Sequence, residues 1–243
     1  MSHQPKILTV IPARGGSKEL PRKNILEISG KPLIAYTIEI ALKLKSLFHR
    51  IIVSTDDLEI AEISKNYGAE VPFIRDKELS LDTTPMVPVL KNAVKFIEDQ
   101  DKINIDWVLL LQPTDPLRES GDIKNALKLG LNNECDSVIS VERVYSHHPT
   151  LMKKIVDNKI EPFFINEVEG TARQNYNPPA YMRNGSIYLT KRQTLMDDES
   201  IRGDISIPLI MEEGSRISID SYNDFKLAEL LIKERVLSSH DKK

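Results

Sequence analysis

The chain has 243 residues, of which 40% are hydrophobic and 28% are charged, a composition typical of a globular protein with a substantial core. Its 33 lysine and arginine residues nearly balance its 36 aspartate and glutamate residues, and the net charge of -3 argues against nucleic acid or a membrane surface as a partner. The single cysteine, Cys135, excludes an intramolecular disulfide and a cysteine-cluster metal site.

The first predicted element is a buried strand over residues 7–11, which leads into a loop rich in glycine and positive charge. Gly15 and Gly16 have no Cβ atom, so the backbone of this loop can approach a ligand closely. The cations of the loop are Arg14, Lys18, Arg22 and Lys23. Such a loop suits a triphosphate. The alternative is an ordinary turn with solvated basic residues, and the crowding of these residues argues against it.

A helix is then predicted to begin near Pro32, because proline is favoured at a first helical position. Its apolar stripe consists of Ile34, Ile38, Ala41 and Leu42. A strand over residues 50–54 follows, and Asp56-x-x-Glu59 has the spacing of a capping box at the start of another helix. Asp56 and Asp57 could instead bind a metal ion, but helix capping is favoured for at least one of them.

A short strand over residues 71–74 is predicted to lead into Arg75, and a helix is predicted to open at Thr84-Pro85. The apolar residues of this helix are Val89, Ala93, Val94 and Ile97.

A continuous apolar strand over residues 107–111 ends at Gln112 and is typical of a strand that is covered on both faces. The alternation of strands and helices predicts an α/β fold with a doubly wound, mostly parallel sheet. In such sheets ligands bind beyond the carboxyl ends of the strands. Arg14, Arg75 and Gln112 each follow such an end, so we expect them to converge on one crevice.

A strand over residues 137–144 is followed by a polar, proline-rich excursion, residues 146–179. Long excursions inside compact domains are usually functional or form an interface. The pair His147-His148 could bind a metal ion, but neighbouring side chains of an extended segment face opposite sides, which favours a polar loop pair.

The chain is predicted to return to the sheet at residues 186–189 and to end in a helix over residues 224–236. The residues expected to be buried on this helix are Leu227, Ala228, Leu231 and Ile232. The tail, residues 238–243, is expected to be disordered. No linker divides the chain, so residues 1–243 are predicted to form a single domain with the excursion as a small lobe.

Several segments resemble, in the same order, the motifs of the acylneuraminate cytidylyltransferases, a family that activates sialic acids and related nine-carbon 2-keto sugar acids as CMP-sugars. The matching segments are residues 11–24, residues 75–79 with 82–84, the sequence LQPTDPLR at residues 111–118, Arg173-Gln174 and residues 184–188. The similarity runs from about residue 6 to about residue 232, and a match over the whole chain is more specific than one loop.

This resemblance implies transfer of CMP from CTP to a nine-carbon keto sugar acid, with release of pyrophosphate, on a nucleotide-diphospho-sugar transferase-like fold. It implies that Arg14 and Lys23 act on the triphosphate during catalysis. The substrate-binding residues that it implies are Ser17 for the phosphates, Asn24, Arg75 and Thr84 for cytidine, Gln112 for the sugar acid and Arg173 for its carboxylate. A surface salt bridge is an equally favoured interpretation of Arg173, and a tight turn is favoured for Asn184-Gly185.

Phosphoryl transfer implies Mg2+, which prefers one or two carboxylates together with phosphate and water oxygens. The resemblance implies Asp220 as the metal ligand. The family commonly has Asp-x-Asp where this chain has Ser218-Ile219-Asp220. Asp115 stands where the family has serine and could replace the missing carboxylate, although a role as a turn residue is favoured.

The resemblance also implies a homodimer, in which the lobe of one subunit reaches toward the active site of its partner. Phe163 and Phe164 form an apolar cluster suited to such an interface, and a cap on the same chain is the alternative. The first six residues lack the apolar core of a signal peptide and no run is long enough to span a membrane, which predicts a cytoplasmic protein.

Two other functions stay open at this point. Enzymes that activate the eight-carbon 3-deoxy-octulosonate resemble the same fold, but they carry Ser-Thr-Arg where Gly16-Ser17-Lys18 stands here. A nucleotide-binding regulator without turnover is the second alternative, and Lys23 and Asp220 argue against it. The sequence leaves the acid open between N-acetylneuraminic, legionaminic and pseudaminic types.

Overall fold

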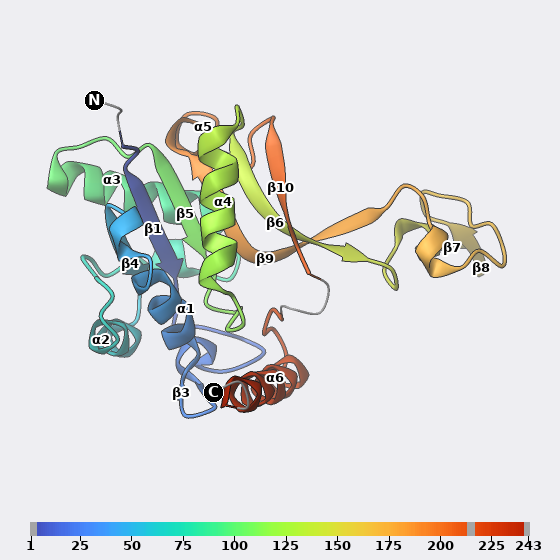
Figure 1. The fold of residues 1–243 in the computed structure, drawn as a ribbon, viewed down its shortest axis with the longest axis horizontal. Helices are drawn as coiled ribbons and strands as arrows, with labels where there is room; N and C mark the ends of the chain where they lie inside the picture. The colour runs from blue at the N-terminus through green and yellow to red at the C-terminus, as the bar shows by residue number, and fades with distance from the viewer. Residues whose placement is uncertain (1–3, 213–216, 241–243) are drawn as a thin grey trace.

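The computed structural model describes residues 4–212 and 217–240. A central sheet carries helices on both faces, and a small lobe projects from one side (Figure 1). The helices are α1 (Leu33–Leu42), α2 (Leu58–Asn66), α3 (Met86–Asp101), α4 (Ser120–Asn132), α5 (Arg192–Met196) and α6 (Tyr222–His240). The strands are β1 (Ile7–Pro12), β2 (Glu27–Ile28), β3 (Lys31–Pro32), β4 (Arg50–Ser54), β5 (Trp107–Leu111), β6 (Ser137–Val144), β7 (Lys153–Val156), β8 (Lys159–Pro162), β9 (Ala180–Lys191) and β10 (Ser206–Met211).

The central sheet has the strand order β10-β6-β9-β5-β1-β4. Strands β4, β1 and β5 run parallel to one another, as do β10 and β6, whereas β9 is antiparallel to both of its neighbours. Pro12 pairs with Ser54, and Val10 pairs with Leu110, so β1, β4 and β5 end at the same edge. The predicted α/β fold with a doubly wound, mostly parallel sheet is confirmed.

Alternating side chains of β1 build the two layers of the core. Ile7 and Ile11 pack in a cluster with residues of α1, α2 and α4, whereas Leu8 and Val10 pack with residues of α3 and α5. All four side chains are buried, because a strand in the middle of a sheet that is covered on both faces exposes neither of its sides. This burial fixes the position of the loop that follows the strand.

Helix α6 closes a third apolar cluster near the end of the sheet where β1 and β5 terminate (Figure 1). Ala228 and Ile232, one helical turn apart, are buried in it with Leu20 of the glycine loop. The predicted burial of Leu227 is wrong, because the helical phase that buries Ala228 and Ile232 turns Leu227 outward, where it is 50% exposed. The helix continues through His240, so the first part of the tail expected to be disordered is helical, and residues 241–243 lie outside the described residues.

The expected strand over residues 71–74 does not form, since only single bridges join Ile52 to Glu70 and Thr55 to Ile74. The patterns above also do not predict α4, α5 or β10. Helix α4 nonetheless has a signal that could have identified it, the helical spacing of its buried residues Ile123, Ala126, Leu127 and Gly130.

The excursion forms the projecting lobe, which β6 and β9 carry away from the body (Figure 1). Its hairpin of β7 and β8 pairs from Lys153 with Pro162 to Val156 with Lys159. No helix among residues 4–212 and 217–240 combines the length and apolar character that crossing a membrane requires.

Candidate active site

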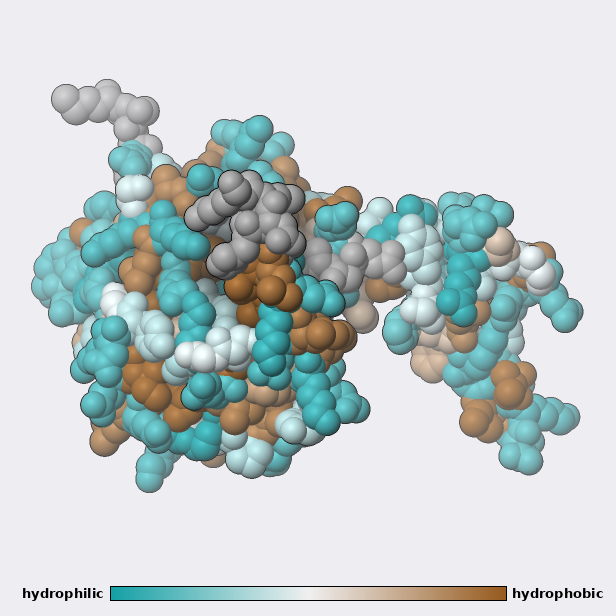
Figure 2. Space-filling model, turned by 60° about the horizontal axis from the view of Figure 1, so that its bottom comes forward, coloured by the Kyte–Doolittle hydropathy of each residue, from teal (hydrophilic) through white to brown (hydrophobic). Residues whose placement is uncertain are grey.

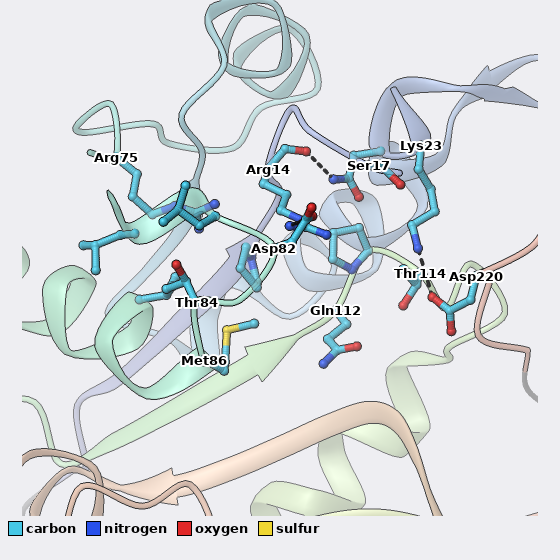
Figure 3. A pocket seen from close by; sticks show the side chains of 16 residues that line it. Arg14, Ser17, Lys23, Arg75, Asp82, Thr84, Met86, Gln112, Thr114 and Asp220 are labelled. Carbon is cyan, nitrogen blue, oxygen red and sulfur yellow. Dashed lines mark hydrogen bonds and ion pairs between the residues drawn. The ribbon is translucent and has the colours of Figure 1, made fainter. Parts of the chain in front are cut away.

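A cavity of about 310 Å3 opens beyond the carboxyl ends of β1 and β5 (Figure 3). All site residues implied by the sequence motifs, except Arg173, line it. The lining residues are Pro12, Arg14, Ser17, Lys23, Asn24, Arg75, Leu79, Leu81, Asp82, Thr84, Met86, Val89, Gln112, Pro113, Thr114 and Asp220. The expected convergence of Arg14, Arg75 and Gln112 on one crevice is confirmed. The parallel strands β1 and β5 place Arg14 and Gln112 there. Arg75 reaches it without the expected strand, since its amide donates to the Thr55 carbonyl, just beyond β4, at 2.8 Å.

Backbone contacts hold the glycine loop over the ends of β1 and β4. The Ala13 amide donates to the Ser54 carbonyl at 2.9 Å, and the Gly15 amide donates to Oδ1 of Asp56 at 3.0 Å. Within the loop, the buried Asn24 amide group donates to the Arg14 carbonyl at 2.9 Å. Asn24 therefore fixes the turn that presents Arg14, and Asp56 supports the loop from β4 instead of capping a helix.

Asp57 joins the loop to helix α2. It is the residue that caps α2, since its carboxylate accepts hydrogen bonds from the Glu59 and Ile60 amides at 3.0 Å. The helix cap favoured for at least one of the two aspartates is therefore confirmed at Asp57, whereas the capping box expected at Asp56 is wrong by one position. Asp57 also forms an ion pair with Arg22, and the hydrogen bond from this guanidinium is the main cause that holds the pKa of Asp57 below its ordinary value.

Replacement of Gly15 by alanine is expected to reduce activity, because a Cβ atom there would lie 2.6 Å from Oδ2 of Asp57. Such overpacking typically costs about 1–3 kcal/mol, and a displaced loop can cost about 100-fold in rate. Gly16→Ala is the matched control, since a Cβ atom at Gly16 meets nothing within 4 Å. Steady-state kinetics and thermal melts of both variants test this. Equal losses for Gly15→Ala and Gly16→Ala would contradict the steric explanation.

Carboxylates from outside the glycine loop pair with its cations. Arg14 and Lys18 both form ion pairs with Asp82, which lies on the segment before α3 (Figure 3). Lys23 donates from Nζ to Oδ1 of Asp220 at 2.9 Å and to the Ile219 carbonyl at 2.8 Å. These three cations of the loop are thus already paired with carboxylates, and Arg14 and Lys23 line the cavity.

Arg75 lies deeper than the other cations and is only 4% exposed. Its guanidinium donates to the Ser54 carbonyl at 3.2 Å and to the Ser80 hydroxyl at 3.0 Å, and it lies 3.9 Å from the Asp56 carboxylate. Burial is the main cause that lowers the pKa of Arg75 from its ordinary value. Its buried position joins the end of β4 to the segment that carries Ser80, so it supports the wall of the cavity.

Gln112 is fixed by a buried network at the end of β5. Arg118 donates to the Gln112 carbonyl at 2.5 Å and to the Ser186 hydroxyl at 3.1 Å, and Ser186 donates to Asp115 at 2.5 Å. A Cβ atom at Gly185, whose φ is +75°, would lie 3.2 Å from the Gln112 side-chain oxygen. Glycine at position 185 therefore leaves room for the Gln112 amide group.

Asp115 does not line the cavity and is only 3% exposed. Both of its carboxylate oxygens accept hydrogen bonds, one from the Leu117 amide at 3.1 Å and one from Ser186. The bond to the amide two residues ahead is the favoured turn role. The structure thus shows Asp115 as a buried turn residue after β5 rather than as a ligand toward the cavity.

Asp220 is the carboxylate with the position and exposure suited to Mg2+. Its side chain is largely exposed at the cavity, and the Ser218 hydroxyl lies 3.2 Å from its Oδ2. Within the part of the chain that the structure describes, no cluster of three or more His, Cys, Asp or Glu side chains could hold a metal ion. Asp220 thus offers a single exposed carboxylate, and a Mg2+ ion there would take its other ligands from phosphate and water oxygens.

The lobe residues lie outside this cavity. Arg173 is exposed in a short 3-10 helix, Arg173–Asn175, and is absent from the cavity lining. His148 is buried, and its ring contacts Thr150 at 3.0 Å and the Pro178 carbonyl at 2.8 Å. The favoured interpretation of a polar loop pair is thus confirmed for His148, which lies in the loop after β6, although its side chain is buried.

The motifs above assign no role to Asp82 or to the apolar side of the cavity. That apolar side consists of Leu79, Leu81, Met86 and Val89. Asp82 belongs to a segment that resembles a nucleotide-binding motif, but its partners lie 64 or more positions earlier in the chain, and no local pattern specifies such a pairing.

Comparison with known proteins identifies the family to which the sequence is similar. A family model described as cytidylyltransferase matches residues 8–240. The chain is 37% identical to the post-translational flagellin modification protein B of Campylobacter coli, over 97% of this chain and 99% of that protein. It is 36% identical to a CMP-N,N'-diacetyllegionaminic acid synthase of Legionella pneumophila, over 93% of this chain and 96% of that protein.

A solved structure of CMP:2-keto-3-deoxy-manno-octonic acid synthetase complexed with CTP has the same fold, with a TM-score of 0.69 and 18% sequence identity. The alignment covers 95% of this chain and 99% of that one. At this identity the likeness shows the fold alone, whereas the family model and the relatives extend over nearly the whole sequence. The chain therefore belongs to the cytidylyltransferase family, and to the acylneuraminate type that its motifs indicated.

Proposed function

We propose that the protein transfers CMP from CTP to a nine-carbon 2-keto sugar acid and releases pyrophosphate. The observation that carries this proposal is that the glycine loop, Arg75 and Gln112 line the same cavity. The similarity to a CMP-legionaminic acid synthase over nearly the whole chain supports a nine-carbon acid as the acceptor. Within this proposal, residues 1–243 form one cytidylyltransferase domain with residues 146–179 as a lobe, and the cytoplasmic location stays a prediction.

Within this proposal, some residues of the cavity bind the phosphates of CTP and others bind its base. Arg14 and Lys23 neutralise the triphosphate, and the Ser17 hydroxyl donates to its oxygens. Asn24 acts through the Arg14 carbonyl that it holds. Thr84, whose hydroxyl donates to the Glu78 carbonyl at 2.9 Å, fixes the segment on the cytidine side of the cavity.

The reaction joins a hydroxyl oxygen of the sugar acid to the α-phosphorus of CTP and breaks the bond from that phosphorus to the bridging oxygen. The hydroxyl proton passes to solvent, and pyrophosphate leaves. Cations held before the substrate arrives stabilise the charge that develops on the phosphoryl oxygens without further reorganisation. Asp220 would hold a Mg2+ ion, which would supply additional screening of the phosphate oxygens.

The test is a coupled assay of pyrophosphate release with CTP, Mg2+ and, in parallel, N-acetylneuraminic, legionaminic and pseudaminic acids. We expect turnover with at least one of the three acids. The eight-carbon 3-deoxy-octulosonate serves as the comparison acid, and UTP and ATP serve as comparison nucleotides. Release only with the eight-carbon acid, equal use of UTP or ATP, or no release with any acid would reject the proposal.

We also propose a homodimer formed through the lobe. Figure 2 shows the lobe standing apart from the body with apolar side chains on its surface. The exposed apolar residues of the lobe are Met152, Ile155, Val156, Ile160, Phe163, Phe164 and Val168. So many exposed apolar side chains in one small lobe are typical of an interface.

Phe164→Asp, at a side chain that is 76% exposed, is expected to shift the protein toward a monomer, because a charge would be buried at the interface. Light scattering at micromolar concentration measures the change. Leu58→Asp is the control, since Leu58 is 74% exposed on α2, away from the lobe. A wild-type protein that is monomeric at this concentration would reject the dimer.

Arg173 is proposed to act in the partner's active site, where its planar fork suits the carboxylate of the sugar acid. Mixing an Arg173→Ala variant with a Lys23→Met variant tests this. In a mixed dimer, the active site of the Arg173→Ala subunit keeps its own Lys23 and receives Arg173 from the other subunit, so one of the two sites is complete. With random exchange, half of the dimers are mixed, so about a quarter of the wild-type activity is expected. Activity that stays at the level of the separate variants would reject a role of Arg173 in the partner's active site.

A further inference from the structure

Asp82 occupies the position between two cations that a polyphosphate would need. Its carboxylate pairs with Arg14 and, at 2.7 Å, with Lys18. Asp82 lies on the opposite wall of the cavity from the glycine loop, on the segment between the 3-10 helix Lys77–Ser80 and α3 (Figure 3). The hydrogen bond from Lys18 is the main cause that lowers the pKa of Asp82, so its side chain is an anion at neutral pH.

We propose that Asp82 is an anionic placeholder that sets the affinity of the cavity for polyphosphate. In the free protein it neutralises Arg14 and Lys18 and holds the two walls together. A bound triphosphate takes over both cations, so Asp82 must leave them. The proposal rests on the proposed function only in that CTP is the natural polyphosphate ligand.

The exposure of these side chains makes the exchange feasible. The Lys18 side chain is 80% exposed and that of Asp82 is 31% exposed, so solvent screens both ion pairs and either pair alone is weak. A triphosphate carries several negative charges and offers oxygens to both cations at once. The placeholder therefore competes with the ligand without preventing its binding.

The position of Asp82 also couples the two halves of the cavity. Leu81 and Thr84, which flank Asp82, line the same cavity, and the Thr84 amide donates to the Leu81 carbonyl at 3.1 Å within one turn. When the phosphates take over Arg14 and Lys18, the turn is freed from the glycine loop on the side where the base is proposed to bind. The ion pairs thus join the two walls of the empty cavity and neutralise Arg14 and Lys18.

The test compares the wild-type chain with Asp82→Asn, which keeps the size of the side chain and removes its charge. Titration calorimetry measures the binding of CTP, inorganic tripolyphosphate and cytidine. We expect Asp82→Asn to bind CTP and tripolyphosphate about three- to tenfold more tightly, because the ligand no longer displaces two ion pairs. Cytidine has no phosphate, so its affinity is expected to stay unchanged.

Asp76→Asn is the matched control. Asp76 is an exposed carboxylate on the same segment, and it forms no ion pair with the residues that the structure describes. The Asp76→Asn variant changes the net charge by the same amount as Asp82→Asn, but we expect it to leave the affinities for CTP, tripolyphosphate and cytidine unchanged. Tighter binding of CTP and tripolyphosphate by both variants would show a general effect of net charge and would overturn the proposal. Tighter binding of cytidine by Asp82→Asn would also overturn it, because Asp82 would then obstruct the base and not compete with the phosphates.

Weaker or unchanged binding of tripolyphosphate by Asp82→Asn, in a variant whose thermal melt matches that of the wild type, would also overturn the placeholder. The proposed transferase function is tested by a separate result. A wild-type chain that binds tripolyphosphate but forms no CMP-sugar would reject the function and leave the result for Asp82 in place.

Discussion

Lys23→Met is expected to lower kcat by about 100- to 1000-fold, because removal of one preorganised charge at a reacting phosphate typically costs about 3–4 kcal/mol of transition-state stabilisation. The effect on folding is expected to be smaller. The Lys23 ammonium group makes hydrogen bonds to Asp220 and the Ile219 carbonyl, and their loss costs no more than about 2 kcal/mol. Steady-state kinetics with CTP and the best acid, together with thermal melts, separate the two effects.

Lys31→Met is the control for this change. Lys31 is also a partly exposed lysine in an ion pair, with Glu39 at 2.6 Å, but it does not line the cavity. We expect its kcat to stay within about twofold of the wild type, since exposed ion pairs contribute little. A Lys23→Met enzyme with near-normal kcat would remove Lys23 from the mechanism.

Asp220→Asn is expected to raise the Mg2+ concentration for half-maximal activity by at least about tenfold, since the neutral amide is a much poorer ligand for this ion than a carboxylate. Asp220 is the carboxylate exposed at the cavity beside Ser218, where the family commonly has a second aspartate. Titration of activity with Mg2+ at saturating CTP measures the change. An unchanged Mg2+ curve for Asp220→Asn would overturn the proposed metal site.

Asp115→Ser provides the comparison for Asp220. Because Asp115 is buried and bonded to Leu117 and Ser186, this variant is expected to keep the wild-type Mg2+ curve. It is expected to lose about 1–3 kcal/mol of stability, the usual cost of leaving buried partners unsatisfied. A raised Mg2+ requirement for Asp115→Ser would show instead that Asp115 replaces the carboxylate absent at Ser218.

Local patterns in the sequence determined the strands that carry the site. The apolar runs that become β1, β4 and β5 are short and bounded by polar residues, and burial on both faces follows from their position in a parallel sheet. Since ligands bind beyond the carboxyl ends of such strands, the sequence also predicted that Arg14 and Gln112 meet, and Arg75 joins them although the strand expected before it does not form. These inferences depend only on periodicity and chain order.

Only the tertiary structure decided which carboxylates meet the cations. Asp56 and Asp57 are neighbours in sequence, yet one supports the Gly15 amide and the other pairs with Arg22. Asp82 and Asp115 each lie within a segment that resembles a site motif, but Asp82 lines the cavity and Asp115 is buried away from it.

The physical reason is that a strand or helix is specified by residues within a few positions, whereas an ion pair depends on the path of segments far apart in the chain. Lys23 and Asp220 are separated by 197 positions and meet because the cluster around α6 brings the end of the chain under the glycine loop. Arg173 lies on the projecting lobe and does not line the cavity, because β6 and β9 carry the lobe away from the body, a path that no local pattern around Arg173 specifies.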